Sequence, residues 1–185
     1  TLLIATSSTH SIAPHLNPKL AYNAEADFTP IAQVATATNI LLVPKDLPVA
    51  TVKEFIAYMK ARPGQLNYAT SGNGTIVHLT TEAFKAQAGI YVTHIPYRGT
   101  ALAIPDLVSN KVQILFDSIV SGMPHVKDGK LKALAVTGKS RSALAPELPT
   151  VAESGLSGFS STTWFGIYGP KGLPPDITAR LNAEF

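Results

Sequence analysis

The sequence predicts an α/β fold in which a mostly parallel sheet is flanked by helices. Two observations lead to this prediction. Short apolar stretches alternate with stretches of helical periodicity along the 185 residues. Loops rich in glycine, serine and threonine join an apolar stretch to the helical stretch that follows it. Strand, short loop and helix repeated in this order are typical of right-handed βαβ units and a parallel sheet.

The first part of the chain is expected to hold two strands and two helices around a loop. Residues 31–43 are long, β-branched and rich in alanine, which favours one strand or two strands in line. Thr51 is a natural N-cap for the next helix, which Pro63-Gly64 ends. The other expected elements are a strand at 2–6, a short helix at 8–16 capped by Ser8 or Thr9, and a loop at 17–30.

The middle of the chain repeats one pattern three times. Each repeat is an apolar strand, a short polar loop and a helix, with strands expected at 66–69, 91–96 and 112–116 and helices at 76–88, 101–109 and from 119 to about 126. One more strand is expected at 131–136, followed by a loop with prolines at 137–150 and a helical turn at 151–155. A last strand is expected at 163–168, and a helix begins at Pro174-Pro175.

Composition excludes several classes of protein. Hydrophobic residues make up 45% and charged residues 15%, which is typical of a folded chain. No run of apolar residues reaches the length of a membrane span. The net charge is only +3 and the arginines are scattered, so a nucleic-acid partner is not expected. The absence of cysteine excludes disulfides, thiolate metal sites and cysteine nucleophiles.

The loop SGNGT, residues 71–75, follows a predicted strand and precedes a predicted helix. Gly72 and Gly74 permit positive φ, and Thr75 is a possible helix cap. Backbone N–H groups that converge at a helix start favour an anion such as a carboxylate or phosphate. Ser71 and Asn73 add side-chain donors. The alternative is that the glycines only shape a tight turn. No lysine follows them and no GxGxxG is present, so nucleotide binding is not expected.

Two further loops come at the ends of predicted strands. In the first, Gly99 allows a turn and Thr100-Ala101 begins a helix, which makes Thr100 either a cap or a ligand contact. In the second, Asp117 follows an apolar strand, and it either caps the next helix or accepts a hydrogen bond from a ligand. Ligands of open parallel sheets bind at the carboxyl ends of the strands, so the three loops are expected to form one binding edge.

Enzyme and metal sites are less well supported. A catalytic triad would need Ser71, Asp117 and either His78 or His94. The chain has no GxSxG motif to support such a triad. The five histidines include no pair spaced i, i+4, and no HExxH motif occurs. No catalytic residue, metal or cofactor is therefore predicted.

The longer motifs resemble a known family. They are LNYATSGNGTIVHLTTEAFKAQAGI, VTHIPYRGTALAIPDLVSNKVQILFDS, LKALAVTGKSRSALAPELPTVAESGLSGF and WFGIYGPKGLPPDITARLN. In this order they are similar to the tripartite tricarboxylate transporter substrate-binding proteins, also called the Bug family, and the opening TLLIATSSTHSIAPHL resembles an earlier segment of that family. The resemblance covers essentially the whole chain.

This resemblance implies a two-lobed periplasmic binding protein of type II, with α/β lobes joined by crossing hinge strands. The first lobe is expected at 1–37 and 162–185, incomplete and discontinuous, and the second at 38–161. Trp164 and Phe165 are expected at the hinge side of the cleft. The implied ligand-binding residues are Ser7, Ser8, Thr9, Ser71, Gly72, Asn73, Gly74, Thr75, Thr100, Ala101 and Asp117.

The function implied is capture of a small carboxylate by hinge closure and delivery to a membrane transporter. The carboxylate would be a di- or tricarboxylate or an aromatic acid. The protein would be periplasmic, non-enzymatic and not embedded in the membrane, and monomeric when full length. A ligand-sensing module for a membrane signalling partner is an alternative, and a hydrolase is a further one. The chain lacks counterparts of the family's export signal, first βα unit and final helices, so it is expected to be a fragment.

Overall fold

The structure is a computed structural model that describes residues 1–185. Contacts between Cα atoms divide the chain into two compact units. Unit 1 holds residues 1–37, 74–76 and 163–185, and unit 2 holds residues 38–73 and 77–162. Two long strands, β2 (Phe28–Pro44) and β7 (Thr162–Pro170), have residues in both units.

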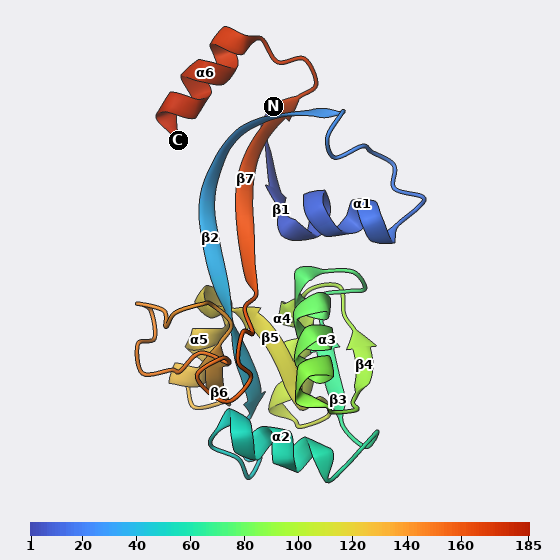
Figure 1. The fold of residues 1–185 in the computed structure, drawn as a ribbon, viewed down its shortest axis with the longest axis vertical. Coiled ribbons are helices and arrows are strands. Elements are labelled where there is room, and N and C mark those ends of the chain that lie inside the picture. The colour runs from blue at the N-terminus through green and yellow to red at the C-terminus, as the bar shows by residue number, and fades with distance from the viewer. The chain divides into compact units, whose positions relative to one another are not determined.

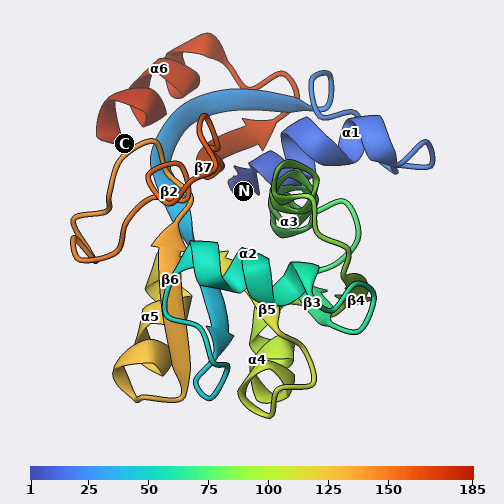
Figure 2. The same ribbon diagram turned by 60° about the horizontal axis from the view of Figure 1, so that its bottom comes forward.

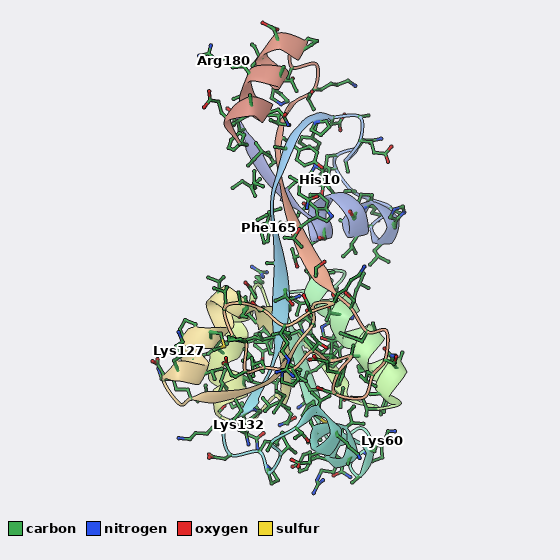
Figure 3. The ribbon with its side chains drawn as sticks, turned by 60° about the vertical axis from the view of Figure 1, so that its left-hand side comes forward. His10, Lys60, Lys127, Lys132, Phe165 and Arg180 are labelled. Carbon is green, nitrogen blue, oxygen red and sulfur yellow. The ribbon has the colours of Figure 1, made fainter.

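Unit 1 is built on antiparallel pairing between the two ends of the chain. Strand β1 (Leu3–Thr6) pairs with β7, and Leu3 lies opposite Tyr168. The neighbour of β7 on its other side is the first part of β2. A π-helical segment η1 (Ser7–Ile12) and helix α1 (Ala13–Leu16) follow β1, and helix α6 (Pro175–Glu184) follows β7 (Figure 1). His10 on η1 and Phe165 on β7 are labelled in Figure 3.

Unit 2 is a sheet with helices on both faces. Its strand order is β6-β2-β5-β3-β4, and β6 and β2 can be followed in Figure 2. Strands β3, β4 and β5 are parallel, whereas β2 is antiparallel to β5 and β6. The strands β3 to β6 span Asn67–Thr70, Thr93–Pro96, Ile114–Ser118 and Leu131–Val136. The helices α2 to α5 span Val52–Lys60, Ile76–Ala88, Thr100–Val108 and Ile119–Lys127.

The side chains of β2 alternate between the two faces of this sheet. Gly122 on α5 lies so close to Ile40 that an added Cβ would be 2.8 Å from Ile40 Cδ1, so Ile40 faces α5. Leu41 pairs with Phe116, and the ring of Phe116 lies edge-on to Phe84 of α3. Leu41 and Phe116 therefore face α3. All of these large side chains are buried, which gives unit 2 a core on both faces of its sheet.

The α/β fold class is confirmed, and several details differ from the sequence prediction. The sheet of unit 2 is mixed because β2 enters between β5 and β6. Strand β2 begins at Phe28, within the expected loop, because its first residues continue the sheet of unit 1 and Thr29 Oγ1 donates to Pro170 O at 3.0 Å. The expected helix at 8–16 is π-helical until Ile12, and 151–155 forms turns.

The predicted helix cap at Thr51 is confirmed, since its hydroxyl accepts from the N–H of Glu54. The predictions of helix 76–88 and strand 131–136 match α3 and β6 residue for residue. None of the helices combines the length and the apolar character that crossing a bilayer requires.

Candidate functional site

The three parallel strands of unit 2 end at the same edge of the sheet. Ala69 of β3 pairs with Leu115 of β5 and with Ile95 of β4, so the loops after these strands start side by side. These are the loops predicted from the sequence as a binding edge. The structure thus brings Ser71, Gly72 and Asn73 to the same edge of unit 2 as Asp117.

The loop at 71–75 has the backbone conformation that its glycines allow. Gly72 has φ of 129° and Gly74 has φ of 72°, both in the region that favours glycine. In unit 2, the N–H of Gly72 donates to Thr70 Oγ1 at 3.1 Å. In unit 1, the N–H of Ile76 donates to Ser8 Oγ at 3.0 Å. A threonine hydroxyl thus holds the backbone within this loop, and a serine hydroxyl holds the backbone just after it.

Thr70 also links the loop to a cluster of aromatic side chains. Its buried hydroxyl lies 2.6 Å from His94 Nε2 on the neighbouring strand. The His94 ring lies nearly parallel to those of Tyr68 and His78, with centroid distances of 4.7 and 4.4 Å. The role of Thr70 was not predicted from the sequence. Strand register pairs His94 with Tyr68 and Thr70 with Pro96, so Thr70 reaches His94 diagonally across two neighbouring strands.

The electrostatics of this cluster favour a neutral imidazole. Burial lowers the pKa of His94 below its ordinary value, and His78 adds to the effect. Burial favours the neutral form of Glu82, but hydrogen bonds from Lys85 and Tyr68 outweigh it and lower the pKa of that carboxyl. Glu82 accepts hydrogen bonds from Tyr68 Oη and, at 2.6 Å, from Lys85 Nζ. The charged pair of Glu82 and Lys85 therefore contacts Tyr68, whose ring in turn contacts the neutral His94.

The second predicted loop differs in how its helix begins. Gly99, with φ of 117°, occupies the N-cap position of α4, and no side chain caps the helix. Thr100 is the first helical residue instead of the cap, because a glycine supplies the turn that a threonine cannot adopt at this φ. Thr100 is half-buried and Ala101 is exposed.

The third predicted position is a buried carboxylate with two partners. Asp117 is 5% exposed. Its Oδ1 accepts from the N–H of Ser118 at 2.8 Å, and its Oδ2 accepts from Ser121 Oγ at 2.8 Å. Ser118 is the N-cap of α5 and accepts from the N–H of Val120. The cap predicted for α5 is therefore Ser118 and not Asp117, which precedes it and binds Ser118 and Ser121. Each carboxylate oxygen of Asp117 keeps capacity for a further donor.

The residues predicted for unit 1 gather after β1. Ser7 Oγ accepts from the N–H of Trp164 at 3.0 Å, so the turn after β1 is tied to β7. Thr9 Oγ1 accepts from Thr6 N–H at 3.1 Å and donates to Thr6 O at 3.2 Å. Trp164 and Phe165 on β7 are half-buried, and Phe165 pairs with Thr6. A separate cavity of about 640 Å³ includes His10 among its lining residues but none of the predicted ligand residues.

Comparisons with known proteins agree on one family. The model of the tripartite tricarboxylate transporter family receptor matches residues 1–185. BugT of Bordetella pertussis is 33% identical over 183 residues, which are 98% of this chain and 56% of BugT. The chain spans about half the length of the curated relatives it matches.

Two solved structures are also closely similar. An R. palustris protein with adipate has a TM-score of 0.95 and 35% identity, over 99% of this chain and 61% of that one. MatC from Rhodopseudomonas palustris with bound malate has a TM-score of 0.88 and 34% identity, over 99% of this chain and 62% of MatC.

Proposed function

The chain belongs to the tripartite tricarboxylate transporter receptor family, and from this premise we propose that it binds a small carboxylate as part of an extracytoplasmic solute-binding protein. The observation that carries the proposal is the loop at 71–75, which follows a strand end of unit 2 and opens helix α3. Two relatives of more than 30% identity were solved with the dicarboxylates adipate and malate.

The chemistry of the predicted residues suits reversible capture of a carboxylate. Ser71, Asn73 and Thr100 carry hydrogen-bond donors, and the starts of α3 and α4 add partial positive charge. Asp117 repels a carboxylate placed beside it, so it favours one orientation of a ligand with unlike ends. We propose Ser71–Thr75, Thr100, Ala101 and Asp117 as ligand residues of one lobe, and Ser7, Ser8 and Thr9 as those of the other.

The rest of the proposed function follows the family. Lobes at 1–37 with 162–185 and at 38–161 would close on the ligand, with Trp164 and Phe165 at the hinge side. Binding would shift the population from open to closed, and the closed protein would deliver the ligand to a membrane transporter from the periplasm. Covalent catalysis is not part of the proposal, since Asp117 is paired with Ser121 and His94 with Thr70 rather than with one another.

Calorimetric titration of the full chain tests this proposal. The panel is adipate, malate, citrate, an aromatic acid and, as a control without a carboxylate, adipamide. We expect at least one carboxylate to bind with a dissociation constant in the micromolar range or lower and adipamide not to bind. Failure of every carboxylate to bind would reject the proposal, and turnover of a bound acid would favour the hydrolase alternative.

A further inference from the structure

A buried asparagine in unit 2 carries a donor that no protein atom accepts. Asn39 is 3% exposed, and its Nδ2 is buried without a hydrogen-bond partner. An unpaired buried donor is unfavourable, so folded proteins contain few of them and each one that persists needs an explanation. The side chain therefore requires an explanation beyond packing.

The backbone of Asn39 is held in place by Thr137, just after the end of β6. The N–H of Asn39 donates to Thr137 Oγ1 at 3.0 Å, and the N–H of Thr137 donates to Asn39 O at 2.8 Å. The hydroxyl of Thr137 donates in turn to Ser161 O at 2.6 Å, and the N–H of Ser161 donates to Thr137 O at 2.8 Å. One threonine thus fixes Asn39, which lies within β2, and Ser161, which directly precedes β7.

Strand register places the amide of Asn39 at the binding edge. Asn39 lies opposite Ser118, the last residue of β5 and the neighbour of Asp117. The side chain of Asn39 points to the same face as that of Leu41, which is the face covered by α3. The loop at 71–75 leads into α3 from the end of β3, the strand on the other side of β5.

The distance between Asn39 and the end of β3 fits the length of a small acid. Strands β2, β5 and β3 are consecutive, so Asn39 and the end of β3 are two strand spacings apart, about 10 Å. A dicarboxylate with hydrogen bonds at both ends is suited to this distance. The amide of Asn39 is a neutral donor, and it stabilises an anion without a buried positive charge of its own.

We propose that Asn39 is a ligand-binding residue whose amide donates a hydrogen bond to a carboxylate oxygen of the bound acid. The assignment rests on the proposed function and adds to it a contact on β2 that the loop motifs do not contain. Thr137 acts as a positioning residue, because its hydroxyl and N–H hold the backbone of Asn39 and leave the Asn39 amide Nδ2 available. The pre-positioned donor gains its partner when the ligand binds.

Titration of Asn39→Ala and Asn39→Asp with adipate and malate tests the assignment, with thermal unfolding of each variant without ligand. We expect Asn39→Ala to weaken binding about 10- to 100-fold, the equivalent of one hydrogen bond to a charged group. Asn39→Asp keeps the size of the side chain but places a carboxylate against the ligand, so it should weaken binding at least as much.

The matched control is Gln113→Leu, which removes a buried amide at the opposite end of the sheet and should leave the affinity of the folded protein unchanged. Equal affinity of both Asn39 variants and the unmodified protein would overturn the assignment and leave the proposed function standing. Absence of carboxylate binding by the unmodified protein would overturn both.

Discussion

The two ends of the sheet in unit 2 treat buried amides in opposite ways. At the amino ends of the parallel strands, Gln113 Oε1 accepts from the N–H of Asn67 at 2.8 Å, and Gln113 Nε2 donates to Asn110 O at 2.6 Å. At the carboxyl ends, Asn39 Nδ2 has no partner. The amino ends of the strands, around Gln113, form a closed end in which both groups of the buried amide are paired. The carboxyl ends, around Asn39, form an open end with an unpaired donor, which we propose serves a ligand.

The largest effect is expected at the closed end. Gln113→Leu removes the acceptor of Asn67 N–H and leaves this group without its partner. The free energy of unfolding should fall by about 1–3 kcal/mol, measured by urea denaturation. A change in ligand affinity of the folded variant, without a change in stability, would contradict the division between the two ends.

The next effect is expected at the open end. Thr70→Val keeps the shape of the side chain but removes the hydroxyl that holds Gly72 N–H and His94. We expect about tenfold weaker carboxylate binding by calorimetry, because the loop at 71–75 loses its anchor, with a stability loss of about 1 kcal/mol. Thr70→Ser retains the hydroxyl and should restore affinity. If Val binds as tightly as Thr, the loop does not depend on this anchor.

The pH dependence of stability should reveal His94. Its pKa is lowered in the folded protein, mainly by burial, so the unfolded chain binds the proton more tightly. The contribution of His94 to stability is therefore fully present above about pH 6.5, the ordinary value of histidine, and is lost as the pH falls toward the lowered pKa. Urea denaturation at pH 7.5, 6.5 and 5.5 measures this loss.

The control for this measurement is His94→Gln, which cannot titrate. The variant should lose less stability between pH 7.5 and 5.5 than the unmodified protein, with the remaining slope due to groups such as His10, whose pKa burial also lowers. Identical slopes for the two proteins would show that His94 titrates alike in the folded and unfolded chain.

The smallest effect is expected from the exposed ion pair at the closed end. Lys111 Nζ lies 3.2 Å from Asp106 Oδ1, but the lysine side chain is 71% exposed. Lys111→Ala should change the free energy of unfolding by no more than about 0.5 kcal/mol, and should not change ligand affinity. A larger loss in urea denaturation would mean that the closed end relies on its surface charges as well as on its amides.

The sequence predicted what local patterns determine. The periodicity of apolar residues predicts helix α3 and strand β6. The cap at Thr51 is predictable because a threonine hydroxyl can bind the N–H group three residues later. The loop at 71–75 was recognisable because glycine has a distinct conformational range. The antiparallel entry of β2 between β5 and β6 was not predicted, because apolar alternation carries no information on which strands become neighbours.

The remaining site features depend on contacts between distant residues. Asn39 and Thr137 are separated by 98 positions, and Thr70 and His94 by 24. No local pattern marks these pairs, since each residue is ordinary in its own strand. Their roles became visible only when strand register placed the side chains together, and the ligand roles of the predicted residues remain proposals.

The pairing of β1 with β7 has a consequence for the order in which the protein forms. Leu3 pairs with Tyr168, and Ser7 holds Trp164 from a distance of 157 positions along the chain. Unit 2, by contrast, is almost continuous in sequence. During synthesis, unit 2 can fold before β7 has been made, and until then the edge of β1 that pairs with β7 stays open to pairing with other strands.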